Sequence, residues 1–448
     1  MMRFLIRFIF FPFYKRDQVM VSSHQGSSLF RENIRRQFSK NRLGVFSLRF
    51  LYGFIMVALL ADFLANEKPL IAKYQGSLYF PVLRSYAVNL GWAQWQKDFQ
   101  HVEWAKIPYE WSVFPPVPYL PQNMDRNNVH SVSPFGEQNL LSLRWRHWFG
   151  TDELGRDILS GMIHGTRIAL TVGLVSMGIA SLFGIFIGAV SGYFGDERLK
   201  LSRASVFMNV LFFVMGFFWA FIARSYEISD ALAISFGKFF LQILFSVLLM
   251  VGALLAGNLL ALPLKLIPIL KKRIAIPVDL IISRFIEVMI SVPVLFLIIS
   301  ISAIVAHPSI YIVMTIIGLT SWTGIARFIR AEMLRIRSLE YIEAARALGY
   351  SEGRVILRHA IPNALSPVLI TIAFGIAAAI MIESTLSFLG VGVSPETVTW
   401  GSLLAEARQS PSAWWLAILP GTAIFVTVTI FNLIGEALTD ALDPKLKK

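Results

Sequence analysis

Several apolar runs of about 20 residues constrain this chain more than any other feature of its sequence, because a helix of that length crosses a bilayer. Only helices and closed barrels satisfy their backbone groups inside the hydrocarbon. Hydrophobic residues make up 55% of the 448 residues, more than a soluble core needs. The sequence therefore predicts an all-α integral membrane protein.

The apolar runs predict about eight transmembrane helices. We place them at 46–65, 168–190, 205–223, 239–262, 284–306, 311–329, 365–389 and 414–435. Lys and Arg favour the cytoplasmic side of a membrane. Residues 1–49 carry ten basic side chains and two acidic ones, whereas residues 66–155 carry eight of each. This asymmetry predicts a cytoplasmic N-terminus, and the even number of crossings then places the C-terminus in the cytoplasm too. It also explains the net charge of +13 without nucleic acid.

Changes in composition along the chain predict six segments. They are a cytoplasmic N-terminal segment (1–45), a first transmembrane helix (46–65), an exported insert rich in Trp, Tyr and Pro (66–150), an interfacial helix followed by a span (151–203), an inserted two-helix membrane segment (204–275), and a core (276–448) with a cytoplasmic loop at 330–362.

Three local features refine this topology. The basic, apolar start, residues 1–16, is expected to lie on the membrane surface. Residues 148–170 are expected to form an amphipathic, interfacial helix that leads into the second span. Tryptophans expected in the outer interfacial belt are Trp400, Trp414 and Trp415.

The loop at 330–362 is expected to contain two short helices. Tyr341, Ala344, Ala345 and Leu348 recur at helical spacing and form a shallow apolar stripe, which suits docking of a partner protein. Gly349 is expected to end the first helix in the left-handed conformation. We expect Ser351 to cap the second helix and Pro362 to end it. The alternative is an ordinary amphipathic connector on the membrane surface.

Two motifs in this loop, EAARALG (343–349) and HAIP (359–362), resemble the EAA loop of ABC importer permeases. His359 and Ile361 depart from the general pattern. Similarity to oligopeptide and dipeptide permeases extends over residues 148–200 and 276–446. It includes FGTDELGRDILSGMIHGTRIAL (149–170), ESTLSFLGVGVSPETVTWGSLLAEA (383–407) and the tail LIGEALTDALDPK (433–445). Residues 66–86 look like a narrower branch that takes up peptides and microcin C in Gram-negative bacteria.

The resemblance implies a permease subunit of an ATP-driven peptide importer in the bacterial inner membrane, with residues 66–150 in the periplasm. It implies three kinds of partner: ABC ATPase subunits, a second permease and a periplasmic substrate-binding protein. The implied ATPase-coupling residues are Glu343, Ala344, Ala345, Arg346, Leu348, Gly349 and Pro362. Residues 204–275 have no counterpart in the usual six-span core. Three interpretations stay open for them: packing in the bundle, contact with an extra partner and a changed lipid boundary, of which packing is the simplest.

The chain contains no phosphate-binding loop of the type G-x-x-x-x-G-K-[ST], so we expect it to be no enzyme. ATP and Mg would bind the partner ATPase, and no cofactor or metal is expected in this chain.

Two other functional classes stay open at this stage. Glu383 lies in an apolar run, where a carboxylate either lines a translocation path or holds helices together through Ser384, Thr385 or an arginine. An ion-gradient-driven secondary transporter is one alternative. The other is a hydrolase, since residues 349–353 match the G-x-S-x-G elbow, with Ser351 as nucleophile. That elbow needs a preceding strand, and a helix is predicted there instead.

The remaining polar residues have structural interpretations. Asp152, Glu153 and Asp157 lack the ligand spacing of a calcium loop and fit the first turn of a helix. Arg284 and Glu287 are expected to pair with cytoplasmic arginines. The histidines of the exported insert are expected on its surface, because they lack metal-like spacing. They are His101, His130 and His147.

Overall fold

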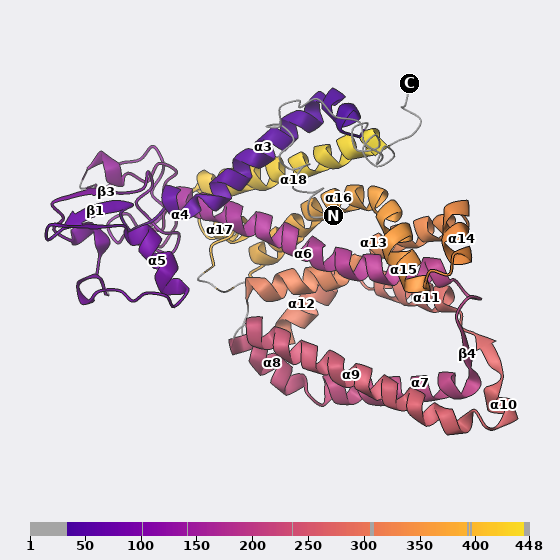
Figure 1. The fold of residues 1–448 in the computed structure, drawn as a ribbon. Helices are drawn as coiled ribbons and strands as arrows, with labels where there is room; N and C mark the ends of the chain where they lie inside the picture. The colour runs from indigo at the N-terminus through magenta and orange to yellow at the C-terminus, as the bar shows by residue number, and fades with distance from the viewer. Residues whose placement is uncertain are drawn as a thin grey trace. The chain divides into compact units, whose positions relative to one another are not determined.

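The computed structural model describes residues 34–100, 102–140, 142–234, 236–304, 309–391, 394 and 397–442. These residues are mostly helical (Figure 1). In this part of the chain, seven helices are long and apolar enough to cross a membrane, and a bent pair makes an eighth if it forms one span. The prediction of a helical membrane protein with about eight spans is therefore confirmed. Residues 1–16 and His101 lie outside the described part.

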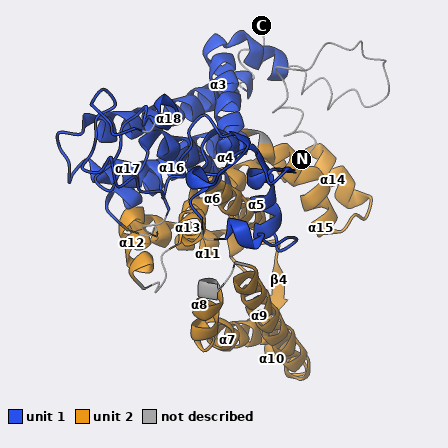
Figure 2. Ribbon diagram, turned by 90° about the vertical axis from the view of Figure 1, so that its left-hand side faces the viewer, with its two compact units in different colours: residues 1–174, 369–390, 395–448 blue, residues 175–368, 391–394 orange. Residues whose placement is uncertain are grey.

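The chain divides into two compact units, shown in Figure 2. The first consists of residues 1–174, 369–390 and 395–448. Its helices and strands are α3 (Arg42–Leu59), α4 (Ala61–Leu64), β1 (Ile71–Tyr74), β2 (Ser77–Tyr79), α5 (Pro81–Asn89), β3 (Trp111–Val113), the start of α6 (Ile158–Phe194), the later part of α16 (Ile361–Phe388), α17 (Trp400–Glu406) and α18 (Trp414–Leu442), together with the short 3-10 turns Lys97–Phe99, Trp104–Lys106 and Leu143–Trp145.

Within the first unit, α3 packs along α18 (Figure 1). Asn41 caps α3 by accepting a hydrogen bond from Gly44 N at 2.9 Å, and its amide donates to Asp440 at 3.0 Å. A Cβ added at Gly44 would lie 2.3 Å from the Cβ of Ala437, so the two backbones approach closely there. One asparagine thus starts the first span and joins it to the end of the last one.

The exported insert contains a small antiparallel sheet with strand order β2-β1-β3. Ala72 lies opposite Tyr79 on one side and Ser112 on the other. Aromatic rings cover the sheet, and Phe99 stacks on Trp104 with centroids 5.4 Å apart. The Lys68 ammonium lies 5.9 Å from the Trp104 ring. These contacts give a segment without a long apolar run a core of its own.

The prediction of an interfacial helix at 148–170 is wrong. Residues 148–157 form a loop with left-handed glycines at Gly150 and Gly155, and α6 runs unbroken from residue 158 to 194. Asp157 starts the helix, because its carboxylate accepts a hydrogen bond from Ser160 N at 2.6 Å. The amphipathic pattern therefore belongs to a loop followed by the first turns of a span.

Two tryptophans assigned to the interfacial belt are instead buried. Trp400 is 2% exposed and donates its indole N–H to Met162 O at 3.0 Å. Trp415 is 4% exposed and donates to Thr151 O at 3.0 Å. Each indole satisfies a backbone carbonyl near the start of α6, which composition alone cannot reveal. Trp414 is exposed, as expected.

The second unit consists of residues 175–368 and 391–394. It contains the rest of α6 and then β4 (Lys200–Ser202), α7 (Arg203–Phe217), the π-helical turn η5 (Phe218–Ile222), α8 (Ser225–Ile234), α9 (Phe236–Leu264), α10 (Pro268–Lys271), β5 (Arg273–Ala275), α11 (Val278–Ser291), α12 (Val294–Ile304), α13 (Ile310–Ile336), α14 (Glu340–Ala347), α15 (Glu352–Val355), the π-helical turn η6 (Ile356–Ala360) and the start of α16.

Glycines bring α6 and α13 into backbone contact within this unit. A Cβ added at Gly188 would lie 2.5 Å from Ala326 O, and one at Gly192 would lie 2.4 Å from Arg330 O. Gly184, Gly188 and Gly192 recur every fourth residue, the small-residue pattern of close helix pairs in membranes. The inner half of α6 and the length of α13 therefore form a tight pair that leads directly to α14.

The single span expected at 284–306 is broken. The helices α11 and α12 meet at an angle of 79° beside Pro293. Proline lacks the N–H that would continue the helix and biases the preceding residue toward extended backbone; Val292 has ψ 124°. The inserted pair of spans, in contrast, is present as α7 with η5 and α9, which pack side by side (Figure 1).

Candidate functional site

The helix α14 presents one apolar row to the unit and another to solvent. Ile342 and Ala345 are buried, at 0% and 6% exposure. Tyr341, Ala344 and Leu348 are exposed, and Leu348 reaches 74%. The expected four-residue stripe therefore loses Ala345 to the interior, since successive rows on a helix face different directions. Tyr341, Ala344 and Leu348 thus remain as an exposed apolar row, while the buried Ile342 and Ala345 pack the opposite side of α14 against the unit.

Gly349 ends α14 as predicted. Its φ is +79°, and its N–H donates to Arg346 O at 2.8 Å, while Tyr350 N donates to Ala345 O at 3.2 Å. This pair of bonds is the Schellman motif, which needs a left-handed residue at this position. A Cβ at Gly349 would meet no atom within 4 Å, so only the backbone conformation requires glycine.

The expected roles of Ser351 and Pro362 are wrong. Ser351 precedes α15 but makes no side-chain cap bond. Pro362 does not end a helix, because α15, η6 and α16 run on without a break from residue 352 to 388. The wide π turn before Pro362 makes room for a residue without an N–H. The Asn363 amide donates to His359 O at 2.7 Å and satisfies a carbonyl of the widened turn.

Arg346 fastens the loop to the end of α6. Its guanidinium lies 5.0 Å from the ring centroid of Tyr193, its Nε donates to the Tyr193 hydroxyl at 3.3 Å, and its terminal nitrogen lies 3.4 Å from Glu352. The Tyr193 hydroxyl itself donates to Glu352. Tyr193 is fully buried. One aromatic ring on α6 thus holds both helices of the loop.

A second polar cluster fixes the helices beneath that ring. Asp279 on α11 accepts two hydrogen bonds from Arg330 on α13, at 2.5 and 2.6 Å, and one from Ser191 on α6 at 2.5 Å. Asp279 is only 9% exposed. The bidentate geometry orients both side chains, and breaking such a pair strands a charge. Three helices are therefore joined close to Tyr193, the ring that holds the loop.

The sequence did not point to Tyr193 and Asp279 as parts of this site. Both lie more than 50 residues from their partners on α13 to α15. A tyrosine in the last turn of a span and an acid in an apolar helix are the signals present in the sequence. Neither signal identifies its partner.

Glu383 is 1% exposed and bonds to its own helix. The Ser387 hydroxyl donates to it at 2.6 Å, and the Ser384 hydroxyl lies at 3.4 Å. Thr385 bonds to Met381 O instead. A Cβ at Gly401 would lie 2.4 Å from Ser384 O, so α17 closes directly over this position. The Glu383 carboxylate is thus hydrogen-bonded by hydroxyls of its own helix and covered by α17.

The acids before α6 organise a loop. Asp152 accepts hydrogen bonds from Leu154 N at 2.9 Å, Arg156 N at 2.7 Å and Arg156 Nε at 2.5 Å. Arg156 also pairs with Glu406. Burial, and the nearby Asp152, raise the pKa of Glu406 to about 8. No group of three or more His, Cys, Asp or Glu suited to a metal ion is found in the described residues.

His147 is not a surface histidine. It is fully buried, with Nδ1 2.8 Å from Asp157 and Nε2 3.2 Å from Asp125. Burial acts to lower the pKa of His147, but the two carboxylates outweigh it and raise that pKa. Its ring stacks on Tyr119 at 4.3 Å. His130, in contrast, is exposed and pairs with Glu153 at 3.0 Å.

Two further expectations are settled by local contacts. Arg284 donates to Glu287 at 2.7 Å, so these two pair with each other rather than with cytoplasmic arginines. The G-x-S-x-G match at 349–353 follows the helix α14 and not a strand. It therefore lacks the strand-to-helix turn that raises a nucleophile over an oxyanion hole.

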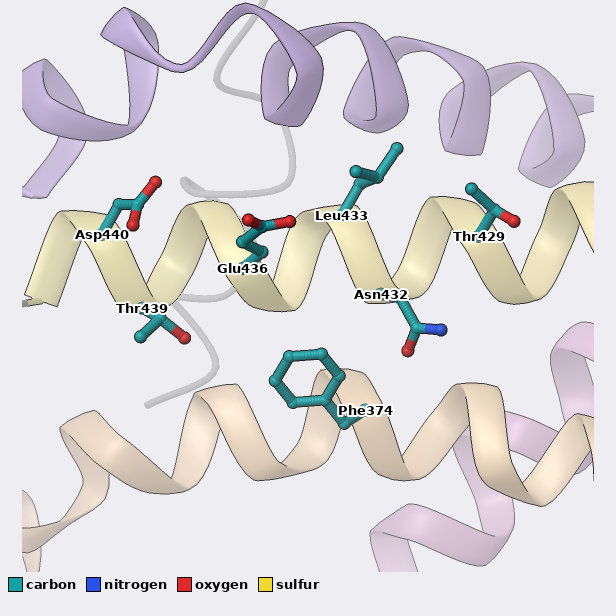
Figure 3. Close-up of a pocket in the computed structure, with 7 residues that line it drawn as sticks. All are labelled: Phe374, Thr429, Asn432, Leu433, Glu436, Thr439 and Asp440. Carbon is teal, nitrogen blue, oxygen red and sulfur yellow. The ribbon is translucent and has the colours of Figure 1, made fainter.

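A groove of about 350 Å³, lined by both apolar and polar side chains, follows α18 (Figure 3). Figure 3 shows Phe374 rising from α16 toward α18. The groove is lined by Phe374, Thr429, Asn432, Leu433, Glu436, Thr439 and Asp440. Polar and acidic side chains on a spanning helix are costly against lipid. This face of α18 therefore requires protein or water beside it.

Two families of known sequences match the chain. Residues 269–448 match the family described as binding-protein-dependent transport system inner membrane component. Residues 28–79 match the N-terminal transmembrane domain of oligopeptide transport permease C.

Several curated proteins are similar over most of their length. The inner membrane ABC transporter permease protein YejE of Escherichia coli is 29% identical over 91% of this chain and 95% of its own. The peptidoglycan transport system permease protein YejE of Agrobacterium fabrum is 27% identical over 92% of each chain. A putative peptide transport system permease protein of Brucella suis is 30% identical over 70% of this chain and 80% of its own.

Proposed function

Because the chain belongs to the family of inner membrane components of binding-protein-dependent transport systems, we propose that it imports peptides or peptide-like compounds and is driven through α14 and α15. It is a multi-pass inner membrane protein and a permease subunit of an ABC importer. The matched family excludes the alternative of a secondary transporter.

The observation that carries the coupling proposal is the construction of the loop. Its outer row, Tyr341, Ala344 and Leu348, is exposed and apolar, while Arg346 and Tyr193 fix its inner side to α6. A partner that grips the outer row would move α6 and α13 together, because the loop is not free to slide. This arrangement suits transmission of a push better than it suits a surface connector.

The partners are part of the proposal. ATP and Mg would bind separate ATPase subunits, so the chain itself is no enzyme, and a periplasmic binding protein would deliver cargo. The polar face of α18 supports a second permease, since lipid is a poor neighbour for Glu436 and Asn432. Both termini would lie in the cytoplasm, on the side of the ATPase.

Copurification tests the assembly, and labelling tests the orientation. Purification in mild detergent should recover an ATPase and a second permease with this chain. The chain has no cysteine, so Leu348→Cys introduces a single thiol. We expect a membrane-impermeant maleimide to label it only in inside-out vesicles, and Phe135→Cys in the exported insert only in right-side-out ones. Labelling of Leu348→Cys from outside would refute coupling to a cytoplasmic ATPase.

A further inference from the structure

The inserted hairpin of α7 and α9 ends in a cluster of cations. The basal patch, as we call it, consists of Lys200, Arg203, Lys265, Lys271, Lys272 and Arg273. The nearest acids within the hairpin, Glu227 and Asp230, lie at its opposite end, where Glu227 pairs with Arg224 at 3.0 Å. Among the described residues, no carboxylate pairs with the basal patch. Two further acids, Asp196 and Glu197, precede Lys200 in the chain, but among the described residues neither makes an ion pair with the basal patch, so its six cations keep a net positive charge.

A two-stranded ribbon holds part of the basal patch in place. In the pair of β4 and β5, Ser202 lies opposite Arg273 and Lys200 opposite Ala275. Opposite residues of an antiparallel pair share a face and successive residues alternate. Lys200 and Arg273 therefore share one face, and Leu201 and Ile274 share the other. The pairing is extended by Arg203 N, which donates to Lys272 O at 3.0 Å.

Exposed apolar side chains lie directly beside these cations. Leu266, Ile267 and Ile269 are 84%, 47% and 70% exposed. They follow α9, whose most apolar window is only 6% buried, and the corresponding window of α7 with η5 is 17% buried. Apolar spans as exposed as these suit contact with acyl chains. Cations next to exposed Leu and Ile, at the end of such helices, match the boundary between headgroups and acyl chains.

We propose that the basal patch binds the headgroups of anionic phospholipids, with Leu266, Ile267 and Ile269 in the adjoining acyl layer. Clusters of four to eight Lys and Arg at the end of a spanning helix suit this ligand. An acidic protein would satisfy the charges equally well, but it would leave the apolar side chains without a reason to be exposed. The observations therefore favour the bilayer.

The base of the hairpin is also tied to the end of α6 near the loop. Asp279 N donates to Gly195 O at 3.3 Å, and Leu280 N donates to the Asp196 carboxylate at 3.0 Å. Tyr193, two residues before Gly195, is the ring that holds Arg346. Lipid bound at the basal patch would thus anchor the hairpin at the same end of α6 as the loop.

Native mass spectrometry of the purified complex tests this proposal. The probe is an equal mixture of phosphatidylglycerol and phosphatidylcholine, added in mild detergent. We expect preferential retention of phosphatidylglycerol, lost at about 1 M salt because screening then acts within about 3 Å. Inorganic phosphate at millimolar concentration should not displace it, since the acyl contacts contribute to binding.

A triple variant, Lys271→Gln, Lys272→Gln and Arg273→Gln, locates the site. Each cation near a surface contributes about fivefold, so removing three should lower retention of phosphatidylglycerol roughly a hundredfold. The matched control removes three exposed cations of the exported insert, Lys97→Gln, Lys106→Gln and Arg126→Gln, and should retain the lipid. Exchanging Lys for Arg and Arg for Lys at 271–273 should also retain it.

Several results would overturn the proposal. One is unchanged lipid retention in the folded triple Gln variant, and another is displacement by phosphate alone. Loss of a copurifying protein with lipid retention intact would assign the basal patch to an acidic partner instead. If the triple variant failed to insert, the salt dependence of the unmodified chain would still decide, because salt-insensitive retention excludes a charged headgroup site.

Discussion

Replacement of Gly349 isolates the contribution of one backbone angle to coupling. An added Cβ meets no atom there, so the entire effect comes from the φ of +79°. A non-glycine residue in the left-handed region costs roughly 1–2 kcal/mol. Gly353 in α15 is the matched control, because it too has open space but no positive φ, and Gly353→Ala should gain about 0.5–1 kcal/mol. Gly349→Ala should therefore lower the population of the ordered end of α14 roughly 5- to 30-fold, whereas Gly353→Ala acts on α15 and not on that end.

The assay has a local and a functional readout. Hydrogen exchange at residues 345–350 reports the Schellman bonds, and cargo-stimulated ATP hydrolysis by the reconstituted importer reports coupling. We expect Gly349→Ala to speed local exchange roughly 5- to 30-fold and to lower the stimulated rate, with insertion unchanged. Gly353→Ala should leave both near their original values.

The rank order of three variants decides between backbone strain and side-chain size. Asn tolerates the left-handed region better than Ala, and β-branched Val tolerates it least. Strain at Gly349 therefore predicts that activity falls from Gly to Asn to Ala to Val. If Ala retained more activity than the larger Asn, volume and not backbone would govern the position. Full activity of Gly349→Val would refute the coupling role of this turn.

Three further predictions concern the anchors of the site. Tyr193→Phe keeps the ring but removes the hydroxyl bonded to Glu352, so it should weaken the loop by about 1 kcal/mol, measured as faster exchange in α14 and α15. Asp279→Asn leaves Arg330 without its carboxylate and should lower the free energy of unfolding by about 2–4 kcal/mol in detergent, with a smaller loss in the double variant that also carries Arg330→Gln. Since the folded pKa of His147 is raised, its stabilisation is complete below about pH 6.5 and is lost as the pH rises through the raised value. Limited proteolysis of the exported insert should therefore accelerate in mildly alkaline buffer, and His147→Gln should remove this dependence.

Most of the fold could be predicted because apolar runs report membrane spans directly. Breaks within the helices were harder to predict, because each depends on the local backbone hydrogen bonds around a proline. The helices α11 and α12 meet at 79° beside Pro293. Pro362, in contrast, lies in a continuous helix and follows a π turn. Pro263, Pro367 and Pro420 also lie inside helices, so a proline in an apolar run does not by itself signal a break. The sequence shows the proline and not the turn.

The candidate site was predictable where it depends on neighbours in the chain. Gly349 is fixed by the helix that precedes it, so the motif sufficed. His147 shows the limit, because spacing made it look like a surface residue while Asp125 and Asp157 enclose it from 22 and 10 residues away. Pairing across such distances is a property of the folded chain, and a single sequence carries no record of it.

The contacts among α6, α11 and α13 indicate which helices would move when a partner protein displaces this loop. Gly188 and Gly192 leave no space for sliding between α6 and α13, and the Asp279 cluster ties α11 to both. A force applied at Leu348 would therefore move these helices as one body. The backbone changes direction by 79° at the break beside Pro293, between α11 and α12 of the same unit. Bending at that break, rather than within the loop, is then the cheapest response of this unit, because every contact between the loop and α6 would survive it.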